Sequence, residues 1–167
     1  MRRGELRAAN VDLVSAYLLA LLIGVVAGLR SITPLAAVSW GARLGWLHLE
    51  NTWLAFLGFA ATPYIVSLLA VGELINDKLP KTPSRKTPVP FGARIVVGAL
   101  CGAALTAHAG MVVGIVAGAI GAVVGTLAGY EFRTRLVATI GGKDLPIALL
   151  EDAIAIGAAF WIVSLAS

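Results

Sequence analysis

The amino-acid sequence predicts an all-α, polytopic membrane protein. Apolar residues make up 59% of its 167 residues and 19 glycines add to that share, whereas an average globular chain is about 45–50% apolar with glycine included. Only 13% of the residues are charged, which is too few to cover the surface of a soluble domain of this length. The apolar residues also gather in runs long enough to cross a bilayer, so lipid is the expected solvent.

These runs predict about five membrane-spanning helices, because a span needs about 20 mostly apolar residues, or about 17 at the short end. One run contains Pro63, and the last carries Glu151 and Asp152 in its first half. The predicted spans cover residues 13–29, 52–72, 91–107, 111–130 and 145–165.

A shorter apolar segment, residues 31–47, lies between the first two predicted spans. It contains Pro34 and closes with Gly41, Arg43 and Gly45. Its length suits a re-entrant or interfacial helix better than a span. The prediction is therefore five spans and one short helix that enters and leaves on the same side.

The basic residues predict the orientation, because short loops rich in Lys and Arg stay in the cytoplasm. Three basic segments are predicted to be cytoplasmic: the N-terminal residues 1–12, the linker 78–90 and the loop before the last span. They agree only if residues 31–47 do not cross; if that segment crosses, the signals conflict. The residues concerned are Arg2, Arg3, Arg7, Lys78, Lys81, Arg85, Lys86, Arg133, Arg135 and Lys143. A cleaved signal peptide is the alternative for the first run, but the run is long for that purpose and Arg30 follows it at once.

The linker 78–90 is rich in proline and should be extended rather than helical. It divides the chain into two membrane halves, residues 13–77 and 91–167. A short echo between Gly28-Leu-Arg30 and Gly92-Ala-Arg94 indicates that the halves are related, although a match of this length also arises by chance.

Six glycines follow one another at spacings of three or four residues, so they share one narrow face of a helix. Such a face lets helix backbones approach closely, which is a main source of helix association in lipid. The expected role is packing, against another part of the chain or a second copy. The six are Gly110, Gly114, Gly118, Gly121, Gly125 and Gly129.

The candidate functional residues are the charges within or beside the spans, since each costs a few kcal/mol at the bilayer centre and needs a partner or water. In the predicted topology Arg30 lies toward the outer side and the others lie toward the cytoplasm. The set consists of Arg30, Glu73, Asp77, Arg94, Glu151 and Asp152.

Two interpretations of these charges stay open. They can form buried ion pairs that fix helix register, or they can line a functional pocket. Four acids against two arginines fit a water-filled cavity or an ion or proton path more naturally, because a buried carboxylate without a partner becomes neutral or opens to water.

The segment from Gly28 to Pro34 predicts an anion site. Ser31 and Thr33 are candidate N-caps of the short helix, and Pro34 suits its first turn. A helix N-terminus beside the guanidinium of Arg30 favours an anion. The alternative is that Arg30 lies at the interface and holds a lipid phosphate.

Four strings occur in the order GLRSITPLAAVSW (28–40), DKLPKTPSR (77–85), GARIVVGALCGA (92–103) and LLEDAIAIG (149–157). Together they resemble the bacterial membrane-protein family named domain of unknown function 4126, over about residues 13–164. The resemblance implies a small integral protein of the bacterial cytoplasmic membrane and supplies neither a substrate nor a reaction.

The leading hypothesis is a protein that binds or translocates a small anionic or phosphate-headgroup substrate, with proton coupling through the carboxylates. Arg30 and Arg94 would hold the anion, and a homo-oligomer is expected because the chain is short. The second hypothesis is a structural or assembly protein whose glycine-rich helix docks a partner. An enzyme ranks last, because no nucleophile with a base is visible. No metal site, cofactor or nucleic-acid partner is expected, because His48 and His108 lack ligand spacing and no basic stripe carries interleaved aromatics.

Overall fold

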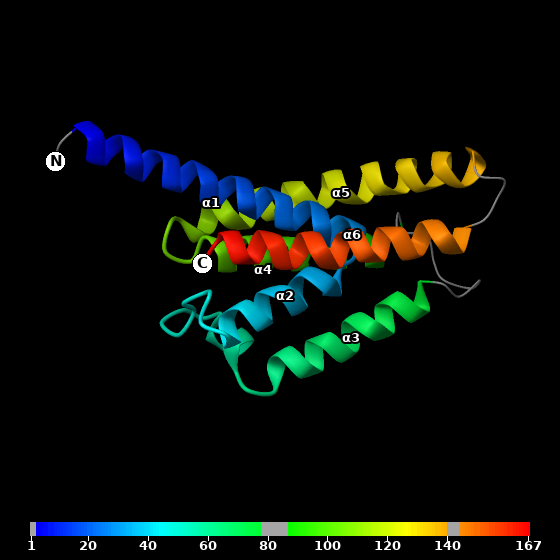
Figure 1. Cartoon of the computed structure of the whole chain (residues 1–167), viewed down its shortest axis with the longest axis horizontal. Helices are drawn as coiled ribbons and strands as arrows, with labels where there is room; N and C mark the ends of the chain where they lie inside the picture. The colour runs from blue at the N-terminus through cyan, green and yellow to red at the C-terminus, as the bar shows by residue number, and fades with distance from the viewer. Residues whose placement is uncertain (1–2, 78–86, 140–143) are drawn as a thin grey trace.

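The computed structural model describes residues 3–77, 87–139 and 144–167, and every regular element in these ranges is a helix (Figure 1). Four of the helices are long and apolar enough to span a membrane: α1, α4, α5 and α6. The elements are α1 (Arg3–Leu29), α2 (Ile32–Arg43), the short 3-10 helix η1 (Ala55–Gly58), α3 (Thr62–Asn76), α4 (Pro88–Leu105), α5 (Met111–Thr139) and α6 (Asp144–Leu165). The prediction of an all-α multi-pass membrane protein is therefore confirmed at this level.

The second predicted span, residues 52–72, is wrong. Its first half forms turns and η1, and α3 begins only at Thr62. Pro63 lies in the first turn of α3, where its missing N–H costs nothing and its ring favours the start of a helix. With 15 residues α3 is about 22 Å long, which is less than the roughly 30 Å of a bilayer core.

The extended conformation predicted for residues 78–90 is wrong at its end. Helix α4 begins at Pro88, and Pro88 and Pro90 belong to its first turn, which tolerates proline. Residues 78–86 of the predicted linker lie outside the described residues. The relation between the two halves of the chain stays a prediction.

Helices α1, α4 and α5 pack tightly together through glycine. A Cβ atom added at Gly118 would lie closer than 3.0 Å to the backbone of Gly98 on α4, and one added at Gly121 or Gly125 would lie equally close to the backbone of α1. Gly110 does not belong to this helical face. It precedes α5 with a φ of 134°, a left-handed value that glycine adopts without strain.

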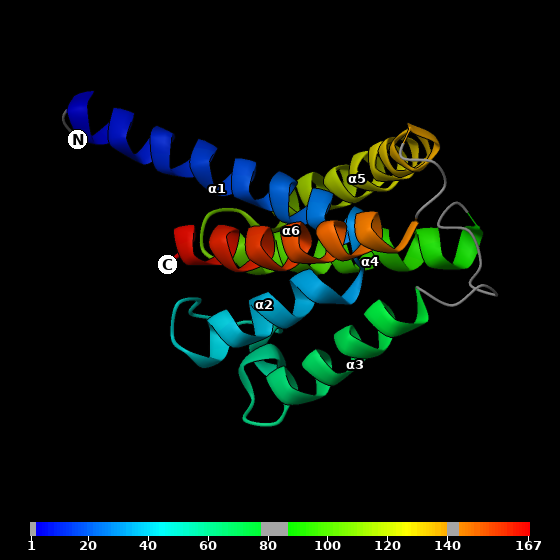
Figure 2. The same cartoon turned by 45° about the vertical axis from the view of Figure 1, so that its right-hand side comes forward.

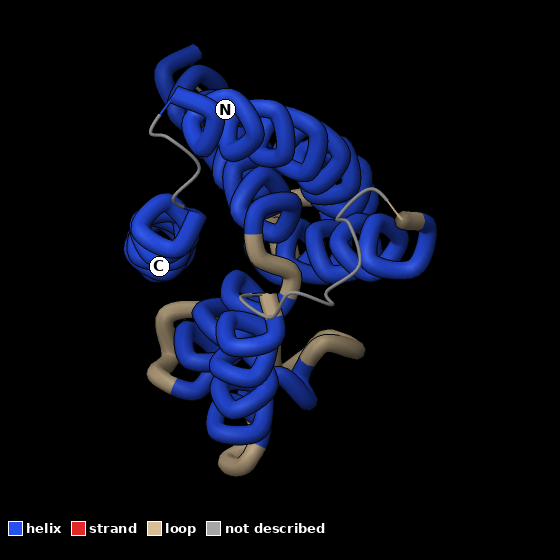
Figure 3. The backbone as a smooth tube through the Cα atoms, turned by 90° about the vertical axis from the view of Figure 1, so that its right-hand side faces the viewer, coloured by secondary structure: helices blue, strands red, loops and turns tan. Residues whose placement is uncertain are grey.

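The other two short helices, α2 and α3, lie side by side as an antiparallel pair (Figure 2). Trp40 packs edge-to-face on Tyr64 with ring centroids 5.1 Å apart, and its indole N–H donates to Ser67 Oγ at 3.0 Å. Helix α6 packs on α2 and α1 and makes little contact with α5. Viewed along the bundle, α6 stands apart from the other helices at the C-terminus (Figure 3).

One end of the bundle collects the end of α1, the start of α2, the end of α3 and the start of α6, because Arg30 contacts both Asp77 and Asp152. We call it the cluster end. Helix α1 begins at the opposite end, about 40 Å away for 27 residues (Figure 1). The three basic segments therefore do not share one side, and the predicted outward position of Arg30, away from the acids, is wrong. The cause is that α2 runs back along the bundle instead of re-entering on the outer side.

Candidate functional site

Arg30 forms the centre of a polar cluster at the junction between α1 and α2. Its side chain is fully buried, and its backbone N–H continues the ladder of α1 by donating to Val26 O at 2.9 Å. The guanidinium Nε donates to Asp152 Oδ1 at 2.6 Å, and Nη1 pairs with Asp77. One arginine thus ties the end of α1 to the end of α3 and to the first half of α6.

Glu73 of α3 closes the N-terminus of α2. Its carboxylate accepts the backbone N–H groups of Ser31 and Ile32, both at 2.8 Å, and the Ser31 hydroxyl. A carboxylate at this position satisfies donors that a helix leaves unpaired and complements the helix dipole. The prediction of Ser31 as a side-chain N-cap is wrong, because its hydroxyl donates to Glu73 and makes no capping bond. The anion expected at this terminus is therefore a carboxylate of the protein itself.

Thr33 lies next to this junction, in the first turn of α2. It is 4% exposed, and its hydroxyl makes no hydrogen bond within the described ranges. Arg94, the second arginine singled out in the sequence, is also buried. It belongs to the part of α4 nearer the cluster end and is 3% exposed.

All four acids singled out in the sequence thus meet around three consecutive residues, Arg30, Ser31 and Ile32. The fourth acid, Glu151, is the most loosely held: its Oε2 lies 3.7 Å from Arg30 Nη2. The same oxygen lies 3.5 Å from Nη1 of Arg133 on α5. Glu151 therefore stands between two guanidinium groups from different helices.

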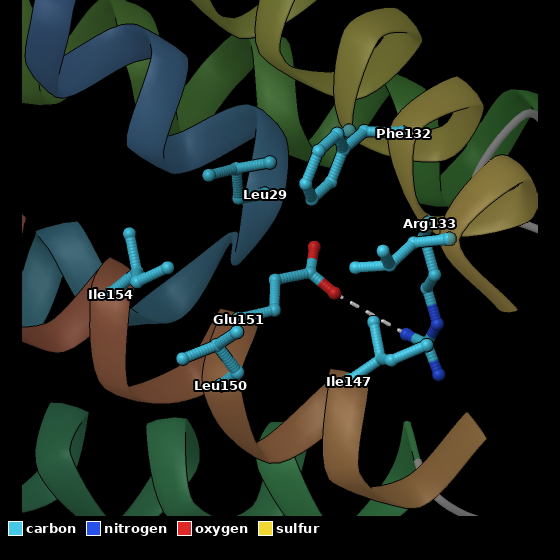
Figure 4. Close-up of a pocket in the computed structure, with 9 residues that line it drawn as sticks. Leu29, Phe132, Arg133, Ile147, Leu150, Glu151 and Ile154 are labelled. Carbon is cyan, nitrogen blue, oxygen red and sulfur yellow. Dashed lines mark hydrogen bonds and ion pairs between the residues drawn. The ribbon is translucent and has the colours of Figure 1, made fainter. Parts of the chain in front are cut away.

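A cavity of about 150 Å³ adjoins Glu151 and Arg133 where α5 and α6 diverge (Figure 4). The figure shows the Glu151 carboxylate pointing from α6 toward Arg133, with Leu29 and Phe132 on the opposite wall. Apart from these two charged residues the walls are apolar. The main apolar side chains are Leu29, Phe132, Leu136, Ile147, Leu150 and Ile154.

The cavity lies on a face that lipid would cover. Phe132, Leu150 and Ile154 at its rim are each more than half exposed, and all three are apolar. Such residues have no reason to face water in a membrane protein, since the surrounding lipid is equally apolar. The cavity is therefore accessible from the acyl-chain region, near the cluster end of the bundle.

Sequence reasoning missed Arg133 as a site residue. The apolar run ends near Tyr130, so Arg133 was predicted to be a loop charge, but α5 continues to Thr139 and carries Arg133 along the cavity wall. The stretch 131–139 has no proline or glycine. That absence was the available signal that the helix continues past the apolar run.

The arrangement does not resemble a metal site in the part of the chain that the structure describes. No three His, Cys, Asp or Glu side chains there are grouped so that they could hold a metal ion. The carboxylates of Asp77 and Asp152 are instead directed at a guanidinium. The chemistry that these residues offer is the binding of charge, by paired arginines and carboxylates beside an apolar cavity.

Comparison with known proteins gives one match. Residues 17–166 match the family described as Domain of unknown function (DUF4126). Neither a curated protein nor a solved structure matches the chain.

Proposed function

The chain belongs to the DUF4126 family, whose description assigns no activity, and we propose that it binds an amphiphilic anion with phosphate oxygens at the cavity between α1, α5 and α6. The observation that carries this proposal is the composition of the cavity wall. An arginine lies at one end of a wall that is otherwise apolar and open to lipid, next to a single carboxylate. This is the arrangement that a phosphate group attached to an apolar chain requires.

Arg133 is the residue that we expect to meet the anion first. Its side chain is 18% exposed, so the guanidinium is reachable from outside the protein. A planar guanidinium binds phosphate oxygens through two parallel hydrogen bonds, and such charge-assisted bonds are about twice as strong as neutral ones. The apolar walls would receive the first methylene groups of the chain, since 150 Å³ holds a part of a lipid and not the whole.

Arg30 supports the site from behind. Because its guanidinium is fully buried and bound to Asp77 and Asp152, the role of anion holder expected for it from the sequence passes to Arg133. Translocation of the anion, also expected from the sequence, would extend the same binding activity across the membrane.

The binding test uses purified protein in detergent and calorimetry with short-chain phosphatidylglycerol, inorganic phosphate and short-chain phosphatidylcholine. We expect phosphatidylglycerol to bind and Arg133→Gln to weaken its binding about tenfold or more, because the lost charge-assisted bonds contribute about 1.5–3 kcal/mol. The matched control is Arg135→Gln on the same helix, since Arg135 is 79% exposed and pairs with Glu131. Phosphate binding without lipid binding would identify a free anion as the ligand, and equal binding by both variants would contradict the assignment to Arg133.

A structural role is the second candidate, and one observation favours it. The buried Arg30 joins three segments that are distant in the sequence, as a fixed ion-pair centre would. If no probe binds to the folded wild-type protein, this role becomes the better explanation of the cluster.

We further propose that the cluster end faces the cytoplasm of a bacterium, so that both termini lie outside (Figure 1). This replaces the cytoplasmic N-terminus predicted from the sequence. The basis is that the cluster end adjoins the linker and the loop between α5 and α6, which carry more Lys and Arg than the N-terminal segment. Alkaline phosphatase fused to the C-terminus should therefore be active and green fluorescent protein fused there should be dark. A fluorescent fusion would reverse the orientation.

A further inference from the structure

Glu151 occupies the place between two guanidinium groups that an anionic oxygen would take. Its Oε2 lies 3.7 Å from Arg30 Nη2 and 3.5 Å from Arg133 Nη1, whereas charge-assisted hydrogen bonds measure about 2.7–2.9 Å. The carboxylate therefore bridges both arginines without a close bond to either. The other acids of the cluster differ: Asp152 lies 2.5 Å from Arg30 Nη2, and Glu73 accepts two backbone N–H groups.

Arg30 Nη2 has unused hydrogen-bonding capacity on this side. Nε and Nη2 both approach the same oxygen, Asp152 Oδ1, and Nε makes the hydrogen bond. Within the described residues Nη2 makes none, although Arg30 is fully buried. A buried N–H left without an acceptor costs about 1–3 kcal/mol. An oxygen placed between Nη2 and Arg133 would satisfy it.

From this geometry we propose that Glu151 is a proton-dependent gate for the anion site. As a carboxylate it holds the position between Arg30 and Arg133. As a carboxylic acid it loses its attraction to both and moves aside, and a phosphate oxygen takes its place. This inference rests on the proposed function of the cavity and adds the coupling: one anion and one proton bind together and leave together.

The charges that face Glu151 support this coupling. Arg30 faces it from the junction of α1 and α2, Arg133 faces it from α5, and Asp152 is its neighbour on α6. Asp77 of α3 shares the guanidinium of Arg30. With Glu151 ionised, three carboxylates surround two guanidinium groups and the site repels an anion. With Glu151 protonated, two carboxylates balance the two guanidinium groups and the repulsion disappears. Among the four acids singled out in the sequence, only Glu151 also lines the cavity.

The probe for the test is short-chain phosphatidylglycerol, a phosphodiester that keeps one negative charge across the pH range used. Calorimetry from about pH 5.5 to about pH 8.5 should show wild-type affinity falling as pH rises, by at most about tenfold per pH unit for one coupled proton. Titrations in two buffers with different ionisation enthalpies should show uptake of about one proton per lipid bound.

Glu151→Gln keeps the size of the side chain and removes its charge. We expect this variant to bind the lipid at every pH with the affinity that the wild type reaches in acid, which is a gain on the order of tenfold at alkaline pH. The matched control is Glu131→Gln on α5, because Glu131 is exposed and pairs with Arg135. This control should keep the wild-type pH profile.

The outcomes separate the gate from the binding site. If the wild type binds the lipid equally at every pH with no proton uptake, the gate is wrong and the binding site stands. If Glu151→Gln is folded and its pH profile matches that of the wild type, the gate is also wrong. If the lipid binds to neither protein at any pH, both proposals fail. Should Glu151→Gln not fold, the proton uptake of the wild type decides the question by itself.

Discussion

Arg30→Met should lower the free energy of unfolding by about 3–5 kcal/mol, the cost of breaking a buried ion pair by removing one partner. The guanidinium is fully buried and neutralises the carboxylates of Asp77 and Asp152. Without it these acids must take up protons or draw water into the bundle. The contact that ties α1 to α3 and α6 is lost as well. Unfolding in mixed detergent micelles, followed by circular dichroism, measures the change.

Two further variants test the cause of this effect. Arg43→Met removes a guanidinium that is exposed at the end of α2, and it should change stability by less than about 0.5 kcal/mol, as surface substitutions do. Adding Asp152→Asn to Arg30→Met should recover part of the loss, because it removes one of the charges left in the bundle. If Arg30→Met unfolds together with the wild type, the ion pairs do not hold the helices together.

Gly118→Val should destabilise the protein by about 3 kcal/mol, the upper end of the range for overpacked cores. The face of α5 around Gly118 lies against the backbones of two helices. A Cβ atom there would lie closer than 3.0 Å to Gly98 O and to the Gly98 carbonyl carbon on α4. A backbone cannot yield as a flexible side chain can, so α4 and α5 must move apart. The same unfolding measurement tests this prediction.

Gly157→Val on α6 is the matched control. A Cβ atom at Gly157 would meet no heavy atom within 4 Å, so only the change in helix propensity remains. We therefore expect the stability of this variant to stay within about 1 kcal/mol of the wild type. Equal losses in both variants would show that valine in a helix, and not contact between backbones, causes the effect.

Several features of the fold could be predicted because they depend on single segments. Long apolar runs predict helices in lipid, and residues 13–29, 91–107, 111–130 and 145–165 all coincide largely with helices of the structure. The lengths of the helices were less accessible. Helix α5 runs past its apolar stretch into residues 131–139, and α3 starts at a proline inside a stretch that hydropathy treats as continuous. Hydropathy reports which residues tolerate lipid, whereas helix ends depend on prolines and local bonds.

The candidate site was predictable in part for a similar reason. Burying a charge is costly wherever the charge sits, and this alone singled out Arg30 and the four acids that surround it. The partners of each were not predictable. Arg30 was expected on the side opposite the acids, and Arg133 was expected in a loop, yet both lie beside Glu151.

The sequence by itself thus determined the solvent of this protein, its helical class and the charges that must find partners, because each of these is a property of a residue or a run. Tertiary structure alone decided that Glu73 closes the start of α2, that Arg30 joins α3 to α6, and that Glu151 stands between two arginines beside an apolar cavity. The physical reason is that a pairing depends on the direction in which each helix runs. Reversing the direction assigned to one short helix, α2, changes which end of the bundle every later residue occupies.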